Sequence, residues 1–136
     1  MNAVNVFMLL TPKSSVSFLF SNDTLKSALK KMRAHGYTSI PVLEEDGRYA
    51  GSVSEGDFLW SLVDCGGDLH SLSSRKVSEI IHENRNTAVR ADVSMKELTE
   101  RALNQNYAPV IDDRGYFIGI VTRRDVMSYL INLSNG

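Results

Sequence analysis

The sequence holds one cysteine, Cys65, among 136 residues. A single cysteine excludes an internal disulfide and is typical of a protein in a reducing compartment. The net charge is −1, which argues against non-specific nucleic-acid binding, because such binding requires a basic face. Long apolar runs are also missing: residues 4–10 are too few to cross a bilayer and lack the basic start of a secretory signal. We therefore expect a cytoplasmic protein without nucleic-acid or membrane partners.

Recognisable catalytic and metal-binding patterns are missing as well. The three histidines, His35, His70 and His82, lie far apart, and none has a second ligand at the spacing of a metal site. No Ser/His/Asp set and no pair of carboxylates has a known catalytic arrangement. We therefore expect neither an enzyme nor a metal or other resident cofactor.

What the chain does contain is an internal repeat. The segment 51–57, Gly-Ser-Val-Ser-Glu-Gly-Asp, returns 68 residues later as 119–125, Gly-Ile-Val-Thr-Arg-Arg-Asp. Over the longer windows 40–57 and 108–125, six of eighteen positions are identical and five more are close substitutions. Unrelated segments of this length share about one identity, so the chain is built from two copies of one unit.

Each copy predicts the order strand, helix, strand, strand, helix, and therefore an α/β (α+β) fold. In the first copy we expect a strand over 16–20, a helix opened by Asn22 and ended at Gly36, a hairpin over 39–53 and a closing helix over 55–65. The second copy repeats this with a strand over 87–90, a helix opened by Ser94, a hairpin over 107–121 and a closing helix. In the second copy's first helix, the inward-facing residues are expected to be Met95, Leu98, Ala102 and Leu103. The boundaries are 1–66 for the first copy with its N-terminal lead-in, 67–76 for a Gly/Ser-punctuated linker, and 77–136 for the second copy.

The Pro-Val strand, the glycine turn and the Gly-x-x-(Ser/Thr)-x-x-Asp junction together resemble a pair of CBS domains, the tandem called a Bateman module. The resemblance covers nearly everything between residues 11 and 131, as in stand-alone bacterial CBS-pair proteins. It implies two repeats packed about a pseudo-two-fold axis and a regulatory, nucleotide-sensing role. Family members mostly bind AMP, ADP, ATP or S-adenosylmethionine in the cleft between the repeats. Some bind cyclic di-AMP, and others have no known ligand.

The repeated junction has chemistry that suits such a ligand. Ser54 and Thr122 stand where a strand ends and a helix begins, so backbone N–H groups and the helix dipole favour an anion there. Asp57 and Asp125, one turn later, are acceptors that suit ribose hydroxyls. The same spacing is also that of a helix-capping box with Asp in place of Glu, and a capping residue can also contact a ligand. Gly51 and Gly119 allow a ligand or another strand to approach the backbone closely.

The CBS pattern implies one ligand site in each copy. In the preferred second copy its residues are Thr87, Val89, Tyr107, Ala108, Pro109, Thr122, Arg123 and Asp125. In the weaker first copy they are Lys13, Ser17, Tyr37, Thr38, Ile40, Pro41, Ser54 and Asp57. The second copy is preferred because Arg123 and Arg124 favour phosphate. The first copy has Glu55 there and no basic replacement, apart from compensation by Lys13 from the preceding loop.

Three functions remain open at this point: an adenine-nucleotide sensor that acts on an unidentified regulated protein, a cyclic di-AMP sensor, and a ligand-free dimerisation scaffold. All three include a homodimer. Its expected surface is the apolar face of the closing helices, which consists of Phe58, Leu59, Trp60 and Leu62 with Val126, Met127 and Leu130.

Overall fold

A computed structural model describes residues 5–82 and 84–135 of the chain. They form two compact units, one over 17–85 and the other from the described residues of 1–16 and 86–136. Among the described residues, no helix combines the length and apolar character needed to cross a membrane.

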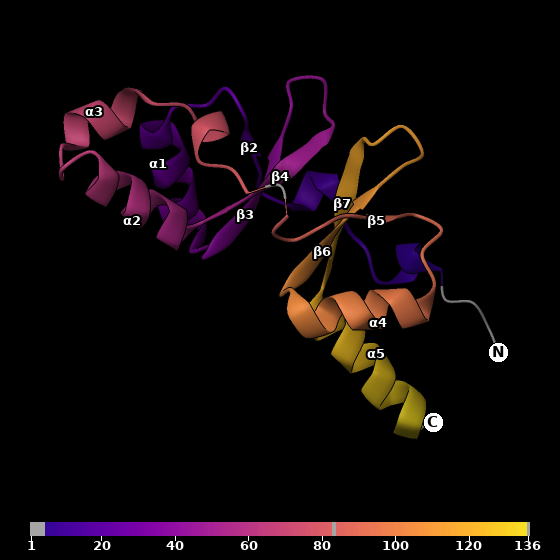
Figure 1. Cartoon of the computed structure of the whole chain (residues 1–136). Helices are drawn as coiled ribbons and strands as arrows, with labels where there is room; N and C mark the ends of the chain where they lie inside the picture. The colour runs from indigo at the N-terminus through magenta and orange to yellow at the C-terminus, as the bar shows by residue number, and fades with distance from the viewer. Residues whose placement is uncertain (1–4, 83, 136) are drawn as a thin grey trace. The chain divides into compact units, whose positions relative to one another are not determined.

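The first unit follows the predicted order of elements (Figure 1). Its elements are β2 (Leu19–Phe20), α1 (Leu25–His35), β3 (Ser39–Leu43), β4 (Tyr49–Ser54), α2 (Glu55–Asp64), α3 (Leu69–Ser74) and η3 (Val77–Glu79). The sheet order is β2-β3-β4, with β2 parallel to β3 and β4 antiparallel to it. Its apolar core gathers around Leu19, Leu25 and Ile40, each of which is completely buried.

The second unit repeats the order strand, helix, strand, strand, helix and adds one strand. Its elements are η1 (Val6–Met8), β1 (Thr11–Pro12), η2 (Lys13–Ser15), β5 (Val89–Arg90), α4 (Met95–Asn104), β6 (Tyr107–Ile111), β7 (Phe117–Thr122) and α5 (Arg123–Asn135). The sheet order is β1-β7-β6-β5, and the two hairpins β3–β4 and β6–β7 can be compared in Figure 1. Its core gathers around Val89, Leu98 and Val110.

The two hairpins match residue by residue, which confirms the repeat. Val42 pairs with Gly51 in the first unit and Val110 with Gly119 in the second. Both ladders then shift register at the next residue, between Val42 and Leu43 and between Val110 and Ile111. Equivalent bulges at equivalent positions show that both segments encode the same local backbone.

Each repeated glycine allows another segment of the chain to approach closely. Thr11 and Pro12 pair with Ile120 and Gly119, so β1 completes the sheet of the second unit. In the first unit His82 forms a bridge with Ser52, beside Gly51. Each copy is therefore flanked by the segment that precedes the other copy in the sequence. This pairing explains why residues 5–16 belong to the second unit, whereas the sequence placed them as a lead-in to the first.

The segment predicted as a linker contains the helix α3, because the Asp68 carboxylate caps it by accepting the N–H groups of His70 and Ser71, and because Leu72 is buried in the core. One local prediction was wrong. The helix α1 is capped by Thr24 rather than Asn22: its hydroxyl oxygen accepts the N–H of Ser27 at 3.2 Å. The predicted stop of α1 at Gly36 is confirmed, since Gly36 has the left-handed φ of 67°.

The apolar face of α4 is also narrower than predicted. Leu98 is buried, but Leu103 is 76% exposed. At 3.6 residues per turn, five residues place Leu103 about 140° around the helix from Leu98, which turns it out of the core-facing stripe.

Candidate ligand site at the strand-to-helix junctions

The second junction lies where β7 passes into α5. The Thr122 hydroxyl accepts the Asp125 N–H at 3.1 Å, so it caps the helix as the spacing predicted. The Asp125 carboxylate is half-buried, and no described residue donates a hydrogen bond to it. This junction thus combines a helix N-terminus with an acceptor group that is still available.

The two arginines beside this junction differ in their contacts. Arg123 is tied down by two bonds, since its Nε donates to the Ala102 carbonyl at 2.7 Å and its backbone N–H to the Asn106 carbonyl at 2.9 Å. These bonds leave the terminal nitrogens of its guanidinium available. Arg124 is exposed, and its side chain has no hydrogen-bond or ion-pair partner among the described residues. Guanidinium groups in this position can meet an anion at the start of α5.

The other predicted residues of the second site lie in or beside the core. Val89, Tyr107, Ala108 and Pro109 are buried on β5 and β6. Thr87 lies before β5 and is enclosed by its own chain: the Gln105 side chain accepts its hydroxyl at 2.9 Å, and Arg101 donates to the same hydroxyl oxygen at 2.9 Å. Gln105 and Arg101 had no motif to identify them, because they contact a segment that lies 14 or more positions earlier in the sequence.

The first junction, between β4 and α2, is closed. The Asp57 side chain is 6% exposed and accepts three hydrogen bonds or ion pairs. Its Oδ2 accepts the Ser54 N–H at 2.7 Å and the Arg85 Nη1 at 2.6 Å, and its Oδ1 lies 3.0 Å from the His82 Nε2. The bond to Ser54 is the helix cap that the spacing predicted. Arg85 and His82 are residues that the sequence did not indicate.

The expectation that the first copy has no basic partner was therefore wrong. Arg85 Nη1 also donates to the Ser54 hydroxyl at 2.7 Å, so a guanidinium stands at the junction beside Glu55. Lys13, the residue expected to compensate, belongs to the second unit. Arg85 belongs to no motif. Its position in the connector that follows the first copy is the one feature of the sequence that relates it to that copy.

The remaining first-copy residues lie at two places: Ser17 precedes β2, and the others lie just before β3 or on its first residues. Ile40 and Pro41 are buried, and Ser17 is half-buried. The Tyr37 ring stacks on His35 with ring centroids 5.8 Å apart, and Thr38 is exposed while its carbonyl accepts the Glu55 N–H at 3.0 Å. These contacts are made within the chain.

A family model of the CBS domain matches residues 10–64 and again residues 77–132. The chain belongs to the CBS-domain family. Both matches end with a closing helix, and together they cover most of the sequence.

Known proteins with the CBS fold resemble the chain over nearly its whole length. A CBS domain-containing protein of Dictyostelium discoideum is 32% identical over 119 residues, which cover 82% of each chain. The crystal structure of Listeria monocytogenes CbpB in complex with c-di-AMP has a TM-score of 0.86 at 19% identity and covers 97% of this chain and 98% of that one. The structure of CBSX2 of Arabidopsis thaliana in complex with AMP has a TM-score of 0.77 at 20% identity, with 96% and 98% covered. At these identities, the two structural matches establish the fold.

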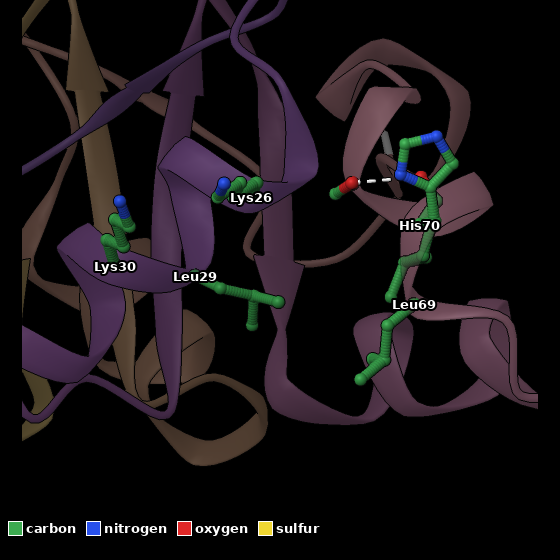
Figure 2. A pocket seen from close by; sticks show the side chains of 7 residues that line it. Lys26, Leu29, Lys30, Leu69 and His70 are labelled. Carbon is green, nitrogen blue, oxygen red and sulfur yellow. Dashed lines mark hydrogen bonds between the residues drawn. The ribbon is translucent and has the colours of Figure 1, made fainter.

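A pocket that no motif indicated lies in the first CBS repeat. It measures about 430 Å³, lies between α1 and α3, and is lined by Lys26, Leu29, Lys30, Leu69, His70, Leu72 and Ser73. In Figure 2, Leu29 of α1 points toward α3, where Leu69 and His70 lie. Hydrogen bonds from Ser71 and His70 hold the pKa of the nearby Asp68 carboxyl below its usual value. The pocket does not include either strand-to-helix junction, so it is separate from the predicted ligand residues.

Metal binding finds no support among the described side chains. Within residues 5–82 and 84–135, no group of three or more His, Cys, Asp or Glu side chains could hold an ion.

Proposed function

We propose that this CBS pair is a regulatory module that binds an adenosine phosphate, of the AMP, ADP or ATP class, at the junction of its second repeat. The observation that carries the proposal is the state of Asp125. Its carboxylate receives no hydrogen bond from the described residues, whereas the equivalent Asp57 is buried and fully bonded. A ligand with hydroxyl groups would meet a free acceptor only in the second repeat. CBSX2, a protein of the same fold, is described in complex with AMP.

Three residues would share the binding of the sugar and the phosphate. Asp125 would accept the ribose hydroxyls. The Thr122 oxygen already accepts one N–H, but its hydroxyl hydrogen can still be donated to a phosphate. The guanidinium of Arg123 would add charge-assisted donors, each worth roughly 1.5–3 kcal/mol. Val89, Tyr107 and Ala108 are buried, so the expected position of the adenine base depends on the family resemblance alone.

Calorimetric titration with AMP and ATP tests this assignment. Asp125→Ala should weaken binding about tenfold or more, because a loss of 1.4 kcal/mol corresponds to a factor of ten. Asp113→Ala is the matched control, since Asp113 is an exposed carboxylate in a turn of the same unit, and it should bind as the wild type does. Equal affinities of the wild type and Asp125→Ala would contradict the assignment.

Cyclic di-AMP is the second candidate ligand. The observation in its favour is the adjacent pair Arg123 and Arg124, because two guanidinium groups suit a ligand with two phosphates. The CbpB protein of the same fold is described in complex with c-di-AMP. In the same titration, binding of cyclic di-AMP at least tenfold tighter than AMP would replace the first candidate with the second. If no adenine nucleotide binds, the remaining hypothesis is that the protein is a ligand-free scaffold.

We propose that the chain regulates an unidentified protein and catalyses no reaction itself. This regulation would take place in the cytoplasm, where the free cysteine Cys65 would stay reduced.

A homodimer is part of this proposal. Of the expected dimer face, Phe58 and Val126 are in fact buried in their own cores. The exposed apolar residues of the closing helices are Leu59, Trp60, Val63, Met127, Ile131 and Leu133.

Trp60 is the centre of the proposed contact on α2, because its large side chain is 65% exposed. A second copy of the chain would cover it. Sedimentation equilibrium should show a dimer for the wild type and a monomer for Trp60→Glu. Lys26→Glu, a substitution at an exposed position on α1, controls for the added negative charge and should remain dimeric. A monomeric wild type at tens of micromolar, on the order of a weak association, would contradict the dimer.

A further inference from the structure

The first CBS repeat carries a built-in occupant at its junction. Arg85 Nη1 lies 2.7 Å from the Ser54 hydroxyl oxygen and 2.6 Å from Asp57 Oδ2. These are the two side chains that, at the equivalent places in the second repeat, are assigned to the phosphate and the ribose. Arg85 thus places a donor between the two groups that a bound nucleotide would contact.

A nucleotide cannot easily displace this donor. Ribose hydroxyls are neutral donors, whereas Arg85 and Asp57 form a charge-assisted bond that is roughly twice as strong as a neutral one. The other Asp57 oxygen faces His82 Nε2 at 3.0 Å, so both oxygens are engaged.

The backbone holds the connector in this place. The His82 N–H donates to the Ser52 carbonyl at 3.1 Å, and the Ser52 N–H donates to the His82 carbonyl at 3.3 Å. Gly51 permits this approach, because a Cβ there would lie 2.9 Å from the His82 carbonyl oxygen. In the second unit the equivalent place beside Gly119 is taken by Thr11 and Pro12, and the next residues, 13–16, include no arginine. The two repeats therefore differ in the segment that flanks them, in addition to the junction itself.

We propose that Arg85 occupies the ribose–phosphate position of the first repeat and closes it, so that the chain binds one adenine nucleotide instead of two. This inference rests on the proposed function for the identity of the ligand. Arg85 would then determine how many nucleotides one chain binds. The difference between the two repeats in nucleotide binding would come from the connector that carries Arg85.

The first test is the stoichiometry of AMP binding by calorimetry. The wild type should bind one AMP per chain, and Arg85→Gln should bind two. Adding Asp57→Ala to Arg85→Gln should return the value to one, because the opened site then lacks its ribose acceptor. Arg48→Gln is the matched control: Arg48 is an exposed arginine of the same unit, paired with Asp46 on the surface, and this variant should bind one. Two sites in the wild type, or one site in a folded Arg85→Gln protein, would overturn the proposal.

A second test needs no nucleotide, so the two proposals can fail separately. Carbodiimide coupling of glycine ethyl ester, read by peptide mass spectrometry, should leave Asp57 unmodified in the wild type and modify it in Arg85→Gln. Asp113 should be modified equally in both proteins. Continued protection of Asp57 in folded Arg85→Gln would overturn the closure, whatever the ligand is. If Arg85→Gln does not fold, Arg85→Lys replaces it in the labelling test. Its shorter and single-headed side chain should expose Asp57 partly, and full protection would count against Arg85.

Discussion

Gly119 is the position at which a single added methyl group should most disturb the second unit. It lies on β7 at φ +155° and pairs with Pro12 of β1. A Cβ built there would lie 2.2 Å from the Thr11 carbonyl oxygen and 2.9 Å from the Leu10 Cδ1. The first of these atoms belongs to the backbone, so a change of side-chain rotamer cannot relieve the overlap.

The cost of Gly119→Ala has two parts. Non-bonded heavy atoms prefer a separation of about 3.5 Å, so β1 would have to move by roughly 1 Å or detach from β7. Overpacking of this kind costs about 1–3 kcal/mol. The backbone at φ +155° lies in a region that residues with a Cβ rarely adopt, and such a conformation adds about 1–3 kcal/mol. We therefore expect a loss of about 3 kcal/mol or more, a large share of the roughly 5–15 kcal/mol by which a domain is stable.

Two other glycines separate these parts. Gly36 has φ +67°, and a Cβ added to it would have no atom within 4 Å, so Gly36→Ala should show the backbone strain alone, about 1 kcal/mol. Gly51 is intermediate, because its Cβ would lie 2.9 Å from the His82 carbonyl oxygen and 3.0 Å from the Ile81 Cγ1. The predicted order of destabilisation is Gly119→Ala, then Gly51→Ala, then Gly36→Ala.

Urea unfolding followed by circular dichroism measures this order, with the m-value checked for each variant so that midpoints can be compared. Hydrogen exchange at the Thr11 amide, the one backbone N–H of β1, would show whether the strand detaches in Gly119→Ala. If Gly119→Ala costs no more than Gly36→Ala, the close approach of β1 to β7 is wrong, and with it the assignment of residues 5–16 to the second unit.

Two further predictions concern individual helices. Leu98→Ala should destabilise the protein by about 2–5 kcal/mol, because it leaves a cavity in the core. Leu103→Ala, on the exposed side of the same helix, should change the free energy of unfolding by less than about 0.5 kcal/mol. Similar losses for the two variants in urea unfolding would mean that α4 presents a different face to the core. The folded-state pKa of Asp68 is lowered by hydrogen bonds from Ser71 and His70, so its stabilising effect on α3 is present above its ordinary pKa of 3.8 and is lost as the pH falls through the lowered value. Hydrogen exchange of the α3 amides between pH 2 and 6, an interval of roughly two units on either side of that pKa, should therefore show protection falling with acid in the wild type and a flatter profile in Asp68→Asn; identical profiles would contradict the cap.

The order of elements was predictable because its signals are local. Apolar residues with a period of 3.6, the turn glycines and the capping residues act within a few positions of one another, and the repeat supplied a second, independent copy of each signal. The errors also have local causes. Thr24 and Asn22 are both capping residues two positions apart, so spacing alone did not choose between them. Leu103 is apolar, but it lies just outside the stripe that Leu98 marks.

The repeat in the sequence is enough to show that two equivalent junctions exist and that each has a hydroxyl, a carboxylate and a capped helix. That the two junctions are in different states becomes visible only in their three-dimensional contacts. Asp57 is closed by Arg85 and Asp125 is open because of which connector passes each hairpin, β1 beside β7 and His82 beside β4. The backbone pairings of these connectors join residues 30 or more positions apart (82 − 52 = 30 for the nearer pair), and they depend on backbone hydrogen bonds and not on particular side chains. Such pairings leave no periodic pattern in the sequence, so they can be identified only from the three-dimensional structure.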